Sequence, residues 1–249
     1  MDVPADLPDA VLRYDDHVDA LLDVHVPATP NGTTVLLLHG GFWKTAYDRT
    51  HTRRMAVALA AEGFLVATPE YRRVGPGGGG GWPTTGADVH RAATLLPGLL
   101  AGIGEEPVTL RVLGHSAGGH LALWLATQED LPVDRVVALA PVCDLREAIR
   151  LRLGSDAARA FLGEIDPGSA DPMVLFDHRP RAEVRIVHGV DDDVVPVALA
   201  RGFVARHPWV GLDVVPGGHY EPIEPGSVAW PAVVGALTGA PVDPVDRAD

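Results

Sequence analysis

The segment 112–119, VLGHSAGG, most constrains what this chain can fold into. An apolar run leads into a Gly-x-Ser-x-Gly pattern centred on Ser116, and an apolar helical pattern follows. This predicts a strand, a sharp turn and a helix, with glycine at 114 and 118 because a larger Cβ would strike the neighbouring strand or helix. The turn would lift the serine hydroxyl to a helix N-terminus, where developing negative charge is favoured. Since the chain has 28 glycines, this motif alone also fits a turn without chemistry.

Three further motifs stand at the ends of predicted strands. The run at 35–43, VLLLHGGFW, is an apolar strand that ends in a His-Gly-Gly turn. The run at 184–196, VRIVHGVDDDVVP, reaches three acidic residues, and the run at 212–220, LDVVPGGHY, ends in a Gly-Gly-His loop. The order Ser, Asp, His along the chain is one that known catalytic triads use. The four motifs together therefore predict a serine, aspartate and histidine triad.

These motifs resemble those of the esterase branch of the α/β-hydrolases. The segment 39–43, HGGFW, is similar to the His-Gly-Gly-aromatic-Trp signature of arylformamidases (kynurenine formamidases) and related bacterial esterases, and EYRR at 70–73 adds to this resemblance. The pattern His-Gly-x-x-Asp-Asp-x-Val that begins at His188 also resembles prolyl-oligopeptidase-like hydrolases. The resemblance covers the chain from about residue 23 to about residue 237. It implies an α/β fold of the α/β-hydrolase type, with a mostly parallel sheet flanked by helices and a short cap segment.

The resemblance implies a role for each triad member. Ser116 is the expected nucleophile, and because a serine hydroxyl is a poor nucleophile at its own pKa, His219 would take its proton. Asp192 is the expected acid, because it holds the fourth position after the histidine in the His-Gly-x-x-Asp pattern. It would orient the imidazole and stabilise its charged form. Asp191 is the first alternative for this role, and Asp193 is less favoured.

The same resemblance implies an oxyanion hole beside the serine. In this fold its backbone N–H groups come from the His-Gly-Gly turn and from the residue after the nucleophile. The expected donors are Ala117 together with Gly41 or Phe42, each contributing about 3 kcal/mol by analogy with known oxyanion holes. Trp43 and Trp82 are the expected substrate-binding side chains, with Trp82 as a wall at the mouth of the site.

Apolar strand patterns alternate with helical patterns along the chain, which favours a mostly parallel sheet. The expected strands lie near 20–26, 33–38, 64–68, 107–113, 135–140, 184–188 and 210–215. The expected helices lie near 48–62, 84–100, 117–128, 196–206 and 227–238. We expect one domain over residues 1–249, with 141–182 as a short cap over the catalytic face. A packing excursion without substrate contact is an equal alternative for that segment.

Composition bears on the class of partner. A formal net charge of −13 argues against nucleic acid, whose phosphates require a basic face. The apolar runs are too short for a membrane span, and the acidic start MDVPAD has no secretory signal pattern. The one cysteine, Cys143, excludes an internal disulfide and fits a reducing compartment. We therefore expect a cytoplasmic protein whose partner is a small-molecule ester or amide, and the sequence leaves the oligomeric state open.

The spacing of the polar residues does not indicate a metal or cofactor site. The carboxylates at 191–193 are consecutive, and consecutive residues in a tight turn rarely converge on one cation. The eleven histidines lack zinc-protease spacing, and the glycines at 77–81 lack the Lys and Ser/Thr of a phosphate-binding loop. No metal and no cofactor are expected. His39, His115 and His188 are expected to hydrogen-bond loop backbone around the site.

We expect hydrolysis of a small carboxylic ester or amide through an acyl-serine intermediate. An arylformamidase-type amide hydrolase is the sharpest alternative, because Phe42 and Trp43 can stack on an aromatic substrate; packing of both side chains beneath the cap is equally compatible. A prolyl-oligopeptidase-like peptidase is less favoured, because the chain has no room for a propeller domain. A non-catalytic binding scaffold would need a broken triad, and all three positions are filled.

Overall fold

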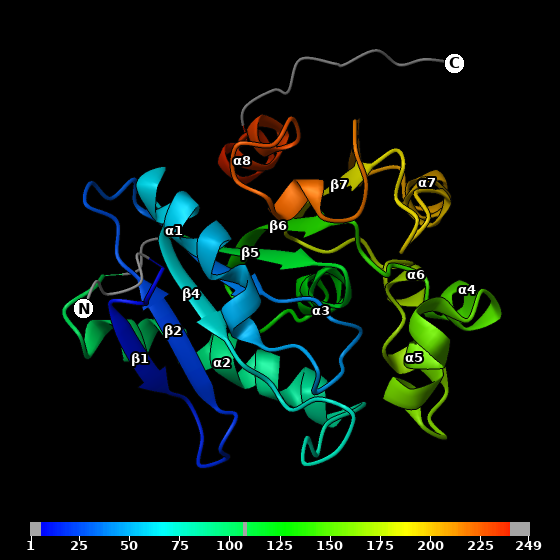
Figure 1. The fold of residues 1–249 in the computed structure, drawn as a ribbon, viewed down its shortest axis with the longest axis horizontal. Coiled ribbons are helices and arrows are strands. Elements are labelled where there is room, and N and C mark those ends of the chain that lie inside the picture. Colours follow the sequence, from blue (N-terminus) through cyan, green and yellow to red (C-terminus); the bar gives the residue numbers. More distant parts are fainter. Residues whose placement is uncertain (1–5, 107–108, 240–249) are drawn as a thin grey trace.

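A twisted, mostly parallel sheet organises the protein (Figure 1). The structure, a computed structural model, describes residues 6–106 and 109–239. Within these residues eight strands form one sheet in the order β1-β2-β4-β3-β5-β6-β7-β8. The strands are β1 (Ala10–Arg13), β2 (Leu21–His25), β3 (Thr33–Leu38), β4 (Leu65–Pro69), β5 (Thr109–His115), β6 (Val133–Leu139), β7 (Glu183–Gly189) and β8 (Gly211–Val215). β2 is antiparallel to β1 and β4, and the pairings from β4 through β3 to β8 are parallel.

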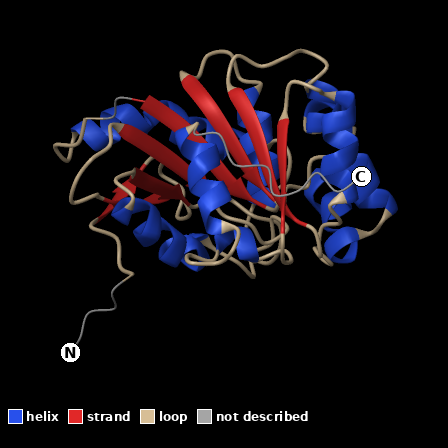
Figure 2. Cartoon of the chain, turned by 90° about the horizontal axis from the view of Figure 1, so that it is seen from above, coloured by secondary structure: helices blue, strands red, loops and turns tan. Residues whose placement is uncertain are grey.

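Helices cover both faces of this sheet (Figure 2). The main helices are α1 (Arg53–Ala61), α2 (Thr84–Ala101), α3 (Ala117–Ala126), α7 (Ala198–Arg206) and α8 (Trp230–Thr238), and short turns form η1 (Arg49–Thr52) and η3 (Glu221–Ile223). α1 and α8 pack on one face, and α2, α3 and α7 pack on the other. Among the residues described, no helix has both the length and the hydrophobicity that a membrane crossing requires.

The sequence of β3 shows why both faces need cover. Val35 and Leu37 belong to the core between the sheet and α1 and α8. Leu36 and Leu38 belong to the core on the opposite face. All four side chains are fully buried. Since side chains alternate across a strand, an uninterrupted apolar run is stable only between two covering layers, as in a parallel sheet.

The predicted elements agree with the structure except at the N-terminal edge of the sheet. The seven expected strands and five expected helices are present, with ends that differ by three residues or fewer. The first two residues of the predicted strand 107–113 lie outside the described residues. The predicted helix 48–62 divides into η1, which Asp48 caps through a hydrogen bond from the Thr50 N–H, and α1. β1 was missed because its four residues alternate between half-buried and exposed at the edge of the sheet.

The segment 141–182, called the cap segment below, forms a helical group at one side of the molecule (Figure 1). It contains α4 (Leu145–Arg150), α5 (Leu153–Leu162), η2 (Pro167–Ser169) and α6 (Pro172–Leu175). The start of α5 is irregular, because Arg152, Ser155 and Asp156 have positive φ. This left-handed region costs roughly 1–2 kcal/mol for each residue that is not glycine. The segment therefore owes its conformation to tertiary contacts, not to helix propensity.

Those tertiary contacts join the cap segment to the loops after β3 and β4. The ring of Phe161 stacks on Trp43 with centroids 4.5 Å apart, and the Phe161 carbonyl accepts a hydrogen bond from the Trp82 N–H over 2.8 Å. Nζ of Lys44 donates to the carbonyl of Gly154 over 2.6 Å. The segment thus lies against the His-Gly-Gly loop, and its role as a cap over the reacting groups stays a prediction.

The carboxyl ends of the parallel strands bring distant loops to one edge of the sheet. Leu38, at the end of β3, pairs with Gly114 of β5, and Gly189, at the end of β7, pairs with Val215 at the end of β8. The loops that follow these strands therefore lie close together, although up to about 180 residues separate them in the sequence. Ligands bind at this edge in open α/β sheets. All four sequence motifs meet there.

Candidate active site

Ser116 stands at the apex of the turn between β5 and α3. Its backbone has φ 55° and ψ −116°, a strained conformation that raises the side chain out of the sheet. A Cβ at Gly114 would strike the carbonyl oxygen of Gly118, and one at Gly118 would strike the carbonyl oxygen of Leu38. Glycine is therefore required at both positions by the close approach of backbone to backbone, as the motif predicts.

A short hydrogen bond joins Asp192 and His219 across two loops. Nδ1 of His219 donates to Oδ2 of Asp192 over 2.7 Å, and both side chains are buried. The N–H groups of Val194 and Val195 donate to Oδ1 of Asp192 at 2.9 and 2.8 Å, which fixes the carboxylate in place. The aspartates on either side of Asp192 are exposed. Of the three adjacent carboxylates, Asp192 is thus the one that the structure brings to the imidazole.

The surroundings of Asp192 keep it ionised. Burial by itself raises the pKa of this carboxyl, but the hydrogen bonds from His188 and His219 outweigh burial and hold the pKa below its ordinary value. Nε2 of His188 lies 3.2 Å from Oδ2 of Asp192 and 2.8 Å from the carbonyl oxygen of Val195. A carboxylate that is charged at neutral pH is able to stabilise positive charge on the neighbouring imidazole.

His115 supports the backbone of the loop that carries His219. Nε2 of His115 donates to the carbonyl of His219 over 2.9 Å, and the two rings are 4.6 Å apart. Burial, and then the nearby His219, lowers the pKa of His115 to about 3, so this ring stays neutral with its proton on Nε2. Together with His39 and His188, it hydrogen-bonds a loop carbonyl, as the sequence predicts.

Ser116 and His219 lie at the same edge of the sheet without a direct hydrogen bond between them. Within the described residues, the hydrogen bonds of Ser116 involve its backbone. The residue before it, His115, holds the His219 backbone, which places the imidazole and the serine at the same edge of the sheet. Hydrogen bonds between catalytic groups are often long before substrate binds and shorten in the complex. The arrangement therefore suits a nucleophile and its base.

The His-Gly-Gly loop lies directly against the serine. A Cβ at Gly40 would lie 2.9 Å from Nδ1 of His115 and 3.2 Å from Cβ of Ser116. A Cβ at Gly41, where φ is 105°, would meet the side chain of Tyr47. Glycine at both positions thus lets the loop backbone approach the predicted nucleophile as closely as an oxyanion hole requires.

Three backbone donors at this point have no acceptor within the described part of the chain. They are the N–H groups of Gly41, Phe42 and Ala117. Ala117 is the first residue of α3, so its N–H also lies at the positive end of the helix. Ala117 is buried, and Gly41 and Phe42 are half-buried. Backbone N–H groups without an internal acceptor are able to hold a bound anion, which makes these three candidates for an oxyanion hole.

The two predicted substrate-binding tryptophans lie in different settings. Trp43 is 1% exposed and is enclosed by Phe161 and by the edge of His120, whose ring centroid is 5.2 Å away. This environment matches the alternative in which Trp43 packs beneath the cap segment. Trp82 is half-buried, and its Nε1 donates to Oγ of Ser169 over 2.9 Å.

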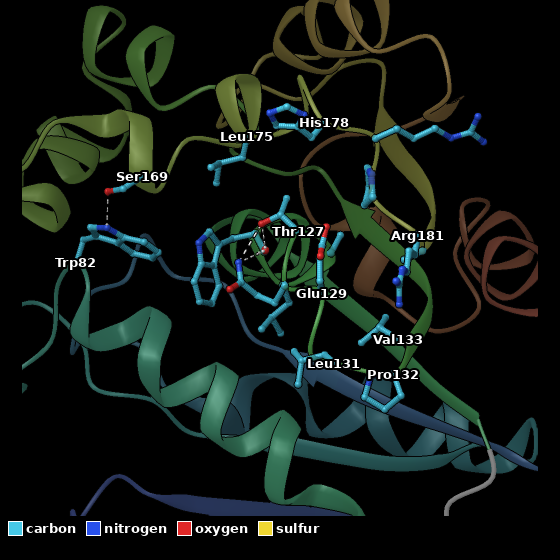
Figure 3. Close-up of a pocket in the computed structure, with 17 residues that line it drawn as sticks. Trp82, Thr127, Glu129, Leu131, Pro132, Val133, Ser169, Leu175, His178 and Arg181 are labelled. Atoms are coloured by element: carbon cyan, nitrogen blue, oxygen red, sulfur yellow. Dashed lines mark hydrogen bonds between the residues drawn. The ribbon is translucent and has the colours of Figure 1, made fainter.

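Trp82 lines a groove of about 680 Å³ along α3 (Figure 3). Its ring meets the edge of Trp124, with centroids 5.1 Å apart, and the groove extends to Val133 at the start of β6. None of the three predicted triad residues lines this groove. Contact between Trp82 and the substrate therefore stays a prediction.

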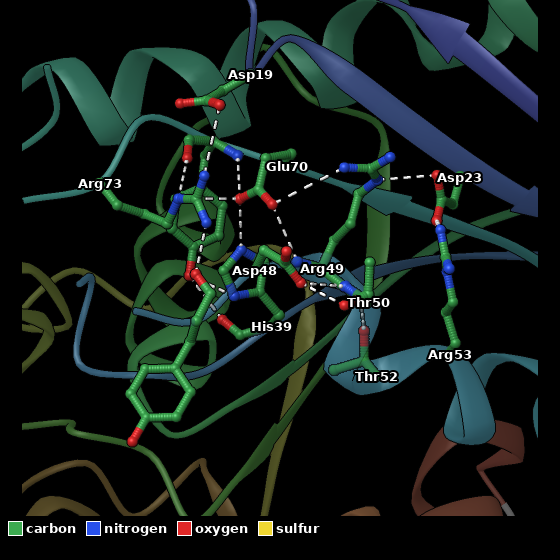
Figure 4. Close-up of polar contacts among 12 residues, drawn as sticks. Asp19, Asp23, His39, Asp48, Arg49, Thr50, Thr52, Arg53, Glu70 and Arg73 are labelled. Atoms are coloured by element: carbon green, nitrogen blue, oxygen red, sulfur yellow. Dashed lines mark hydrogen bonds and ion pairs between the residues drawn. The ribbon is translucent and has the colours of Figure 1, made fainter. Parts of the chain in front are cut away.

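A buried polar network behind the His-Gly-Gly loop was missed by sequence reasoning (Figure 4). Glu70, directly after β4, accepts a hydrogen bond from Nε2 of His39 over 2.9 Å and another from the N–H of Arg49 over 3.0 Å. Arg49 in turn donates through Nε to Asp23 of β2 over 2.8 Å. The sequence indicates 70–73 only as part of a resemblance. Glu70 also contacts two near neighbours in the sequence, the N–H of Tyr71 and Nε of Arg73. The partners that join it to the His-Gly-Gly loop and to η1 are His39 and Arg49, which are 31 and 21 residues away and give no local pattern.

In the described ranges 6–106 and 109–239, no group of three or more His, Cys, Asp or Glu side chains is arranged to hold a metal ion. Cys143 is fully buried after β6, and burial raises the pKa of its thiol well above the ordinary value. The thiol therefore remains protonated and offers no second nucleophile. The triad of Ser116, Asp192 and His219 thus stays the predicted set of reacting side chains.

The chain is similar in sequence and in structure to known esterases. A "probable carboxylic ester hydrolase LipM" of Mycobacterium tuberculosis (strain ATCC 25618 / H37Rv) is 25% identical over 211 residues, which cover 76% of this chain and 48% of the relative. The chain thus spans about half the length of this relative. A truncated carbohydrate esterase from gut microbiota superposes with a TM-score of 0.77 at 18% identity, covering 94% of this chain and 96% of that one.

A thermophilic esterase, Est2 of the Planctomycetes species Thermogutta terrifontis, is also similar in structure. With propionate bound it gives a TM-score of 0.73 at 22% identity, covering 95% of this chain and 94% of that one. Phosphonylated by sarin it gives 0.74 at 20% identity, covering 98% and 100%. These likenesses and the sheet order confirm the predicted α/β-hydrolase fold.

The BD-FAE family profile matches residues 22–149. This range contains the His-Gly-Gly loop, Glu70 and Ser116, and it ends before the loops that carry Asp192 and His219. It spans 128 residues (149 − 22 + 1) of the 249 in the sequence, which is more than half. The chain belongs to the BD-FAE family.

Proposed function

We propose that this protein is a serine hydrolase that cleaves small carboxylic esters through an acyl-serine intermediate. The observation that carries the proposal is the 2.7 Å hydrogen bond between His219 and the ionised Asp192, at the sheet edge where Ser116 stands on a strained turn. The similar proteins, a probable carboxylic ester hydrolase and several esterases, support the same chemistry.

In this mechanism Ser116 Oγ attacks the carbonyl carbon of the ester. Nδ1 of His219 is committed to Asp192, which leaves Nε2 to take the serine proton and later to return it to the departing alcohol. Asp192 stabilises the imidazolium that forms between these steps. Water, activated by the same Nε2, then attacks the acyl carbon and releases the acid and the free serine.

The negative charge on the tetrahedral carbon's oxygen needs donors that are in place before the reaction. The N–H groups of Gly41, Phe42 and Ala117 are without acceptors in the described structure and lie beside the serine, so they suit this task. One such donor contributes about 3–4 kcal/mol to lowering the barrier in known enzymes. Fixed backbone donors also avoid the cost of reorganising solvent as charge develops.

A formyl amide is the second candidate substrate class, because the loop 39–43 resembles the arylformamidase signature. The burial of Trp43 removes one of the two aromatic side chains on which that alternative depends. Phe42, which is partly exposed next to the donor loop, remains able to contact an aromatic group. A small ester requires no aromatic contact with Trp43 or Phe42, which favours it over the formyl amide.

A hydrolysis panel separates the two classes. We expect p-nitrophenyl acetate and butyrate to be cleaved faster than the octanoate, because the Ser116 side chain lies in a confined position with 2% of the residue exposed. N-formylkynurenine, at the same concentrations, is the amide arm. Marked preference for it would replace the ester proposal with the amide hydrolase. Folded protein that cleaves none of the four would contradict the proposed function altogether.

A further inference from the structure

His39 holds both of its ring nitrogens against hydrogen-bond acceptors. Nε2 lies 2.9 Å from Oε1 of Glu70 (Figure 4), and Nδ1 lies 2.8 Å from the carbonyl oxygen of Gly40. An ionised carboxylate and a carbonyl accept hydrogen bonds and donate none. A neutral ring would leave one nitrogen facing an acceptor without a proton, whereas an imidazolium cation would donate to both acceptors.

Glu70 is placed to be the counter-ion of such a cation. Burial alone raises the pKa of the Glu70 carboxyl, but the hydrogen bond and charge of His39, followed by the Arg49 N–H, hold that pKa below its ordinary value. The two side chains are only 1% and 3% exposed. An isolated charge at this depth would be strongly unfavourable, and each member of the pair supplies the partner that the other needs.

Two aromatic rings and one guanidinium group pack around the pair. Tyr71 stacks on the imidazole at 4.2 Å and donates its hydroxyl proton to the His39 carbonyl over 2.7 Å. The ring of His51 meets the imidazole edge-on at 6.3 Å, and burial lowers the pKa of His51, so that it stays neutral. On the other side of Glu70, Nε of Arg73 lies 3.2 Å from the oxygen that binds His39.

We propose that His39 is protonated and that the Glu70–His39 pair strengthens the oxyanion donor at Gly41, a role that rests on the function proposed above. The Gly40 carbonyl that accepts from His39 belongs to the same peptide group as the N–H of Gly41. A charged donor at one end of a peptide polarises the group and makes the N–H at its other end a stronger donor. The cation therefore acts through one peptide group on the negative charge that develops beside the serine.

The same contacts fix the direction of that donor. The Gly40–Gly41 peptide cannot rotate without breaking the 2.8 Å bond to His39, whose far nitrogen is anchored on Glu70. A donor that is held in place before the reaction stabilises charge without reorganisation. Glu70 and His39 touch neither the substrate nor the reacting atoms, so both are positioning residues.

The protonation state is measured on the wild-type protein. With 15N-labelled histidine at pH 8, where a free imidazole is neutral, His39 should show two protonated ring nitrogens, assigned by loss of the signal in His39→Asn. In Glu70→Gln the same ring should lose one proton. A wild-type His39 ring with only one protonated nitrogen would overturn the proposal. This measurement is made on the wild-type protein, and a variant is needed only to assign the signal.

The kinetic consequence is measured in Glu70→Gln, which keeps an acceptor for Nε2 but removes the counter-ion. We expect kcat for p-nitrophenyl acetate to fall about three- to tenfold and KM to change less than about twofold, because the weakened donor acts on the transition state. Complete loss of an oxyanion donor lowers kcat by about 10²–10³-fold, so a weakened donor should cost less. The matched control is Asp88→Asn, which removes another buried carboxylate. Oδ1 of Asp88 lies 2.5 Å from a guanidinium nitrogen of Arg72, which follows β4 as Glu70 does.

The control should be less stable than wild type and have the same kcat. An unchanged kcat in Glu70→Gln, or equal losses in both variants, would overturn the proposal. Failure of the proposed function looks different. In that case the wild-type protein would neither hydrolyse the ester nor react with a fluorophosphonate at Ser116, whereas the NMR result for His39 would stand.

Discussion

Replacement of Asp171 by asparagine should raise stability relative to wild type progressively as the pH increases towards and beyond 6. Oδ1 of Asp171 accepts hydrogen bonds from the N–H groups of Leu145 and Met173 at 3.1 and 3.2 Å, and so joins the starts of α4 and α6 in the cap segment. Oδ2 is buried with no partner among the described residues. Burial, with a further contribution from nearby Asp144, raises the pKa of Asp171 from 3.8 to about 6.

The sign and size of the effect follow from these two pKa values. Below pH 3.8 the carboxyl is neutral in the folded and the unfolded chain, and its full contribution to stability is present. As the pH rises, the unfolded chain releases the proton first, and stability is lost until the pH passes the folded pKa of about 6. At 1.36 kcal/mol for each pKa unit, the loss reaches about 3 kcal/mol. Asparagine keeps the Oδ1 acceptor and cannot ionise.

Urea unfolding at several pH values measures this loss. Between pH 4.5 and pH 8, the free energy of unfolding of Asp171→Asn minus that of wild type should increase by about 2 kcal/mol. A constant cost of burying the amide cancels in this comparison. Asp166→Asn removes a cap-segment carboxylate whose side chain is 79% exposed, and so controls for the change in net charge. A difference that stays constant, or that decreases as the pH rises, would refute the reasoning.

Three predictions address the reacting groups. Ser116→Ala should reduce kcat by roughly 10⁵–10⁶-fold without unfolding, and labelling of this variant by a fluorophosphonate, with most activity retained, would contradict the nucleophile. Asp192→Asn should reduce kcat about 10⁴-fold, and Asp191→Asn and Asp193→Asn about twofold or less; a larger loss at 191 would show that the other carboxylate orients the base. The value of kcat/KM should fall on the acidic side with a single-proton slope, because the base must be neutral to take the serine proton. Asp192 adds no second proton, since its pKa lies below its ordinary value and it stays charged. EDTA should not change the profile, and full activity at pH 4 would indicate another base.

The parts of the fold that the sequence predicts are those fixed by local sterics and periodicity. Gly114 and Gly118 allow the turn to be predicted, because only glycine permits the backbone contacts found there. The uninterrupted apolar runs identify the parallel strands, since a strand covered on both faces has no polar side. Asp192 is predictable because the distance from His188 to the acid is set within one short loop.

Other features depend on contacts that the chain makes only after folding. The half-exposed β1 has no apolar run to mark it, and its place is set by pairing with β2. The burial of Trp43 depends on Phe161, 118 positions later in the sequence (161 − 43). Glu70 likewise reaches His39 and Arg49, 31 and 21 positions away, and Asp171 reaches Leu145, 26 positions away. No spacing rule identifies these distant partners.

The stack of Phe161 on Trp43 limits how this protein can diverge. A segment inserted between two strands can usually be exchanged during evolution without disturbing the sheet, and loops of this kind are where new substrate preferences arise. Here, exchange of the cap segment would also remove Phe161, which supports the His-Gly-Gly loop beside Ser116. A descendant protein that gains a new substrate preference through the cap segment must therefore keep an aromatic ring at position 161, or compensate with a second substitution that packs on Trp43. Changes in substrate selectivity and in turnover are thus coupled.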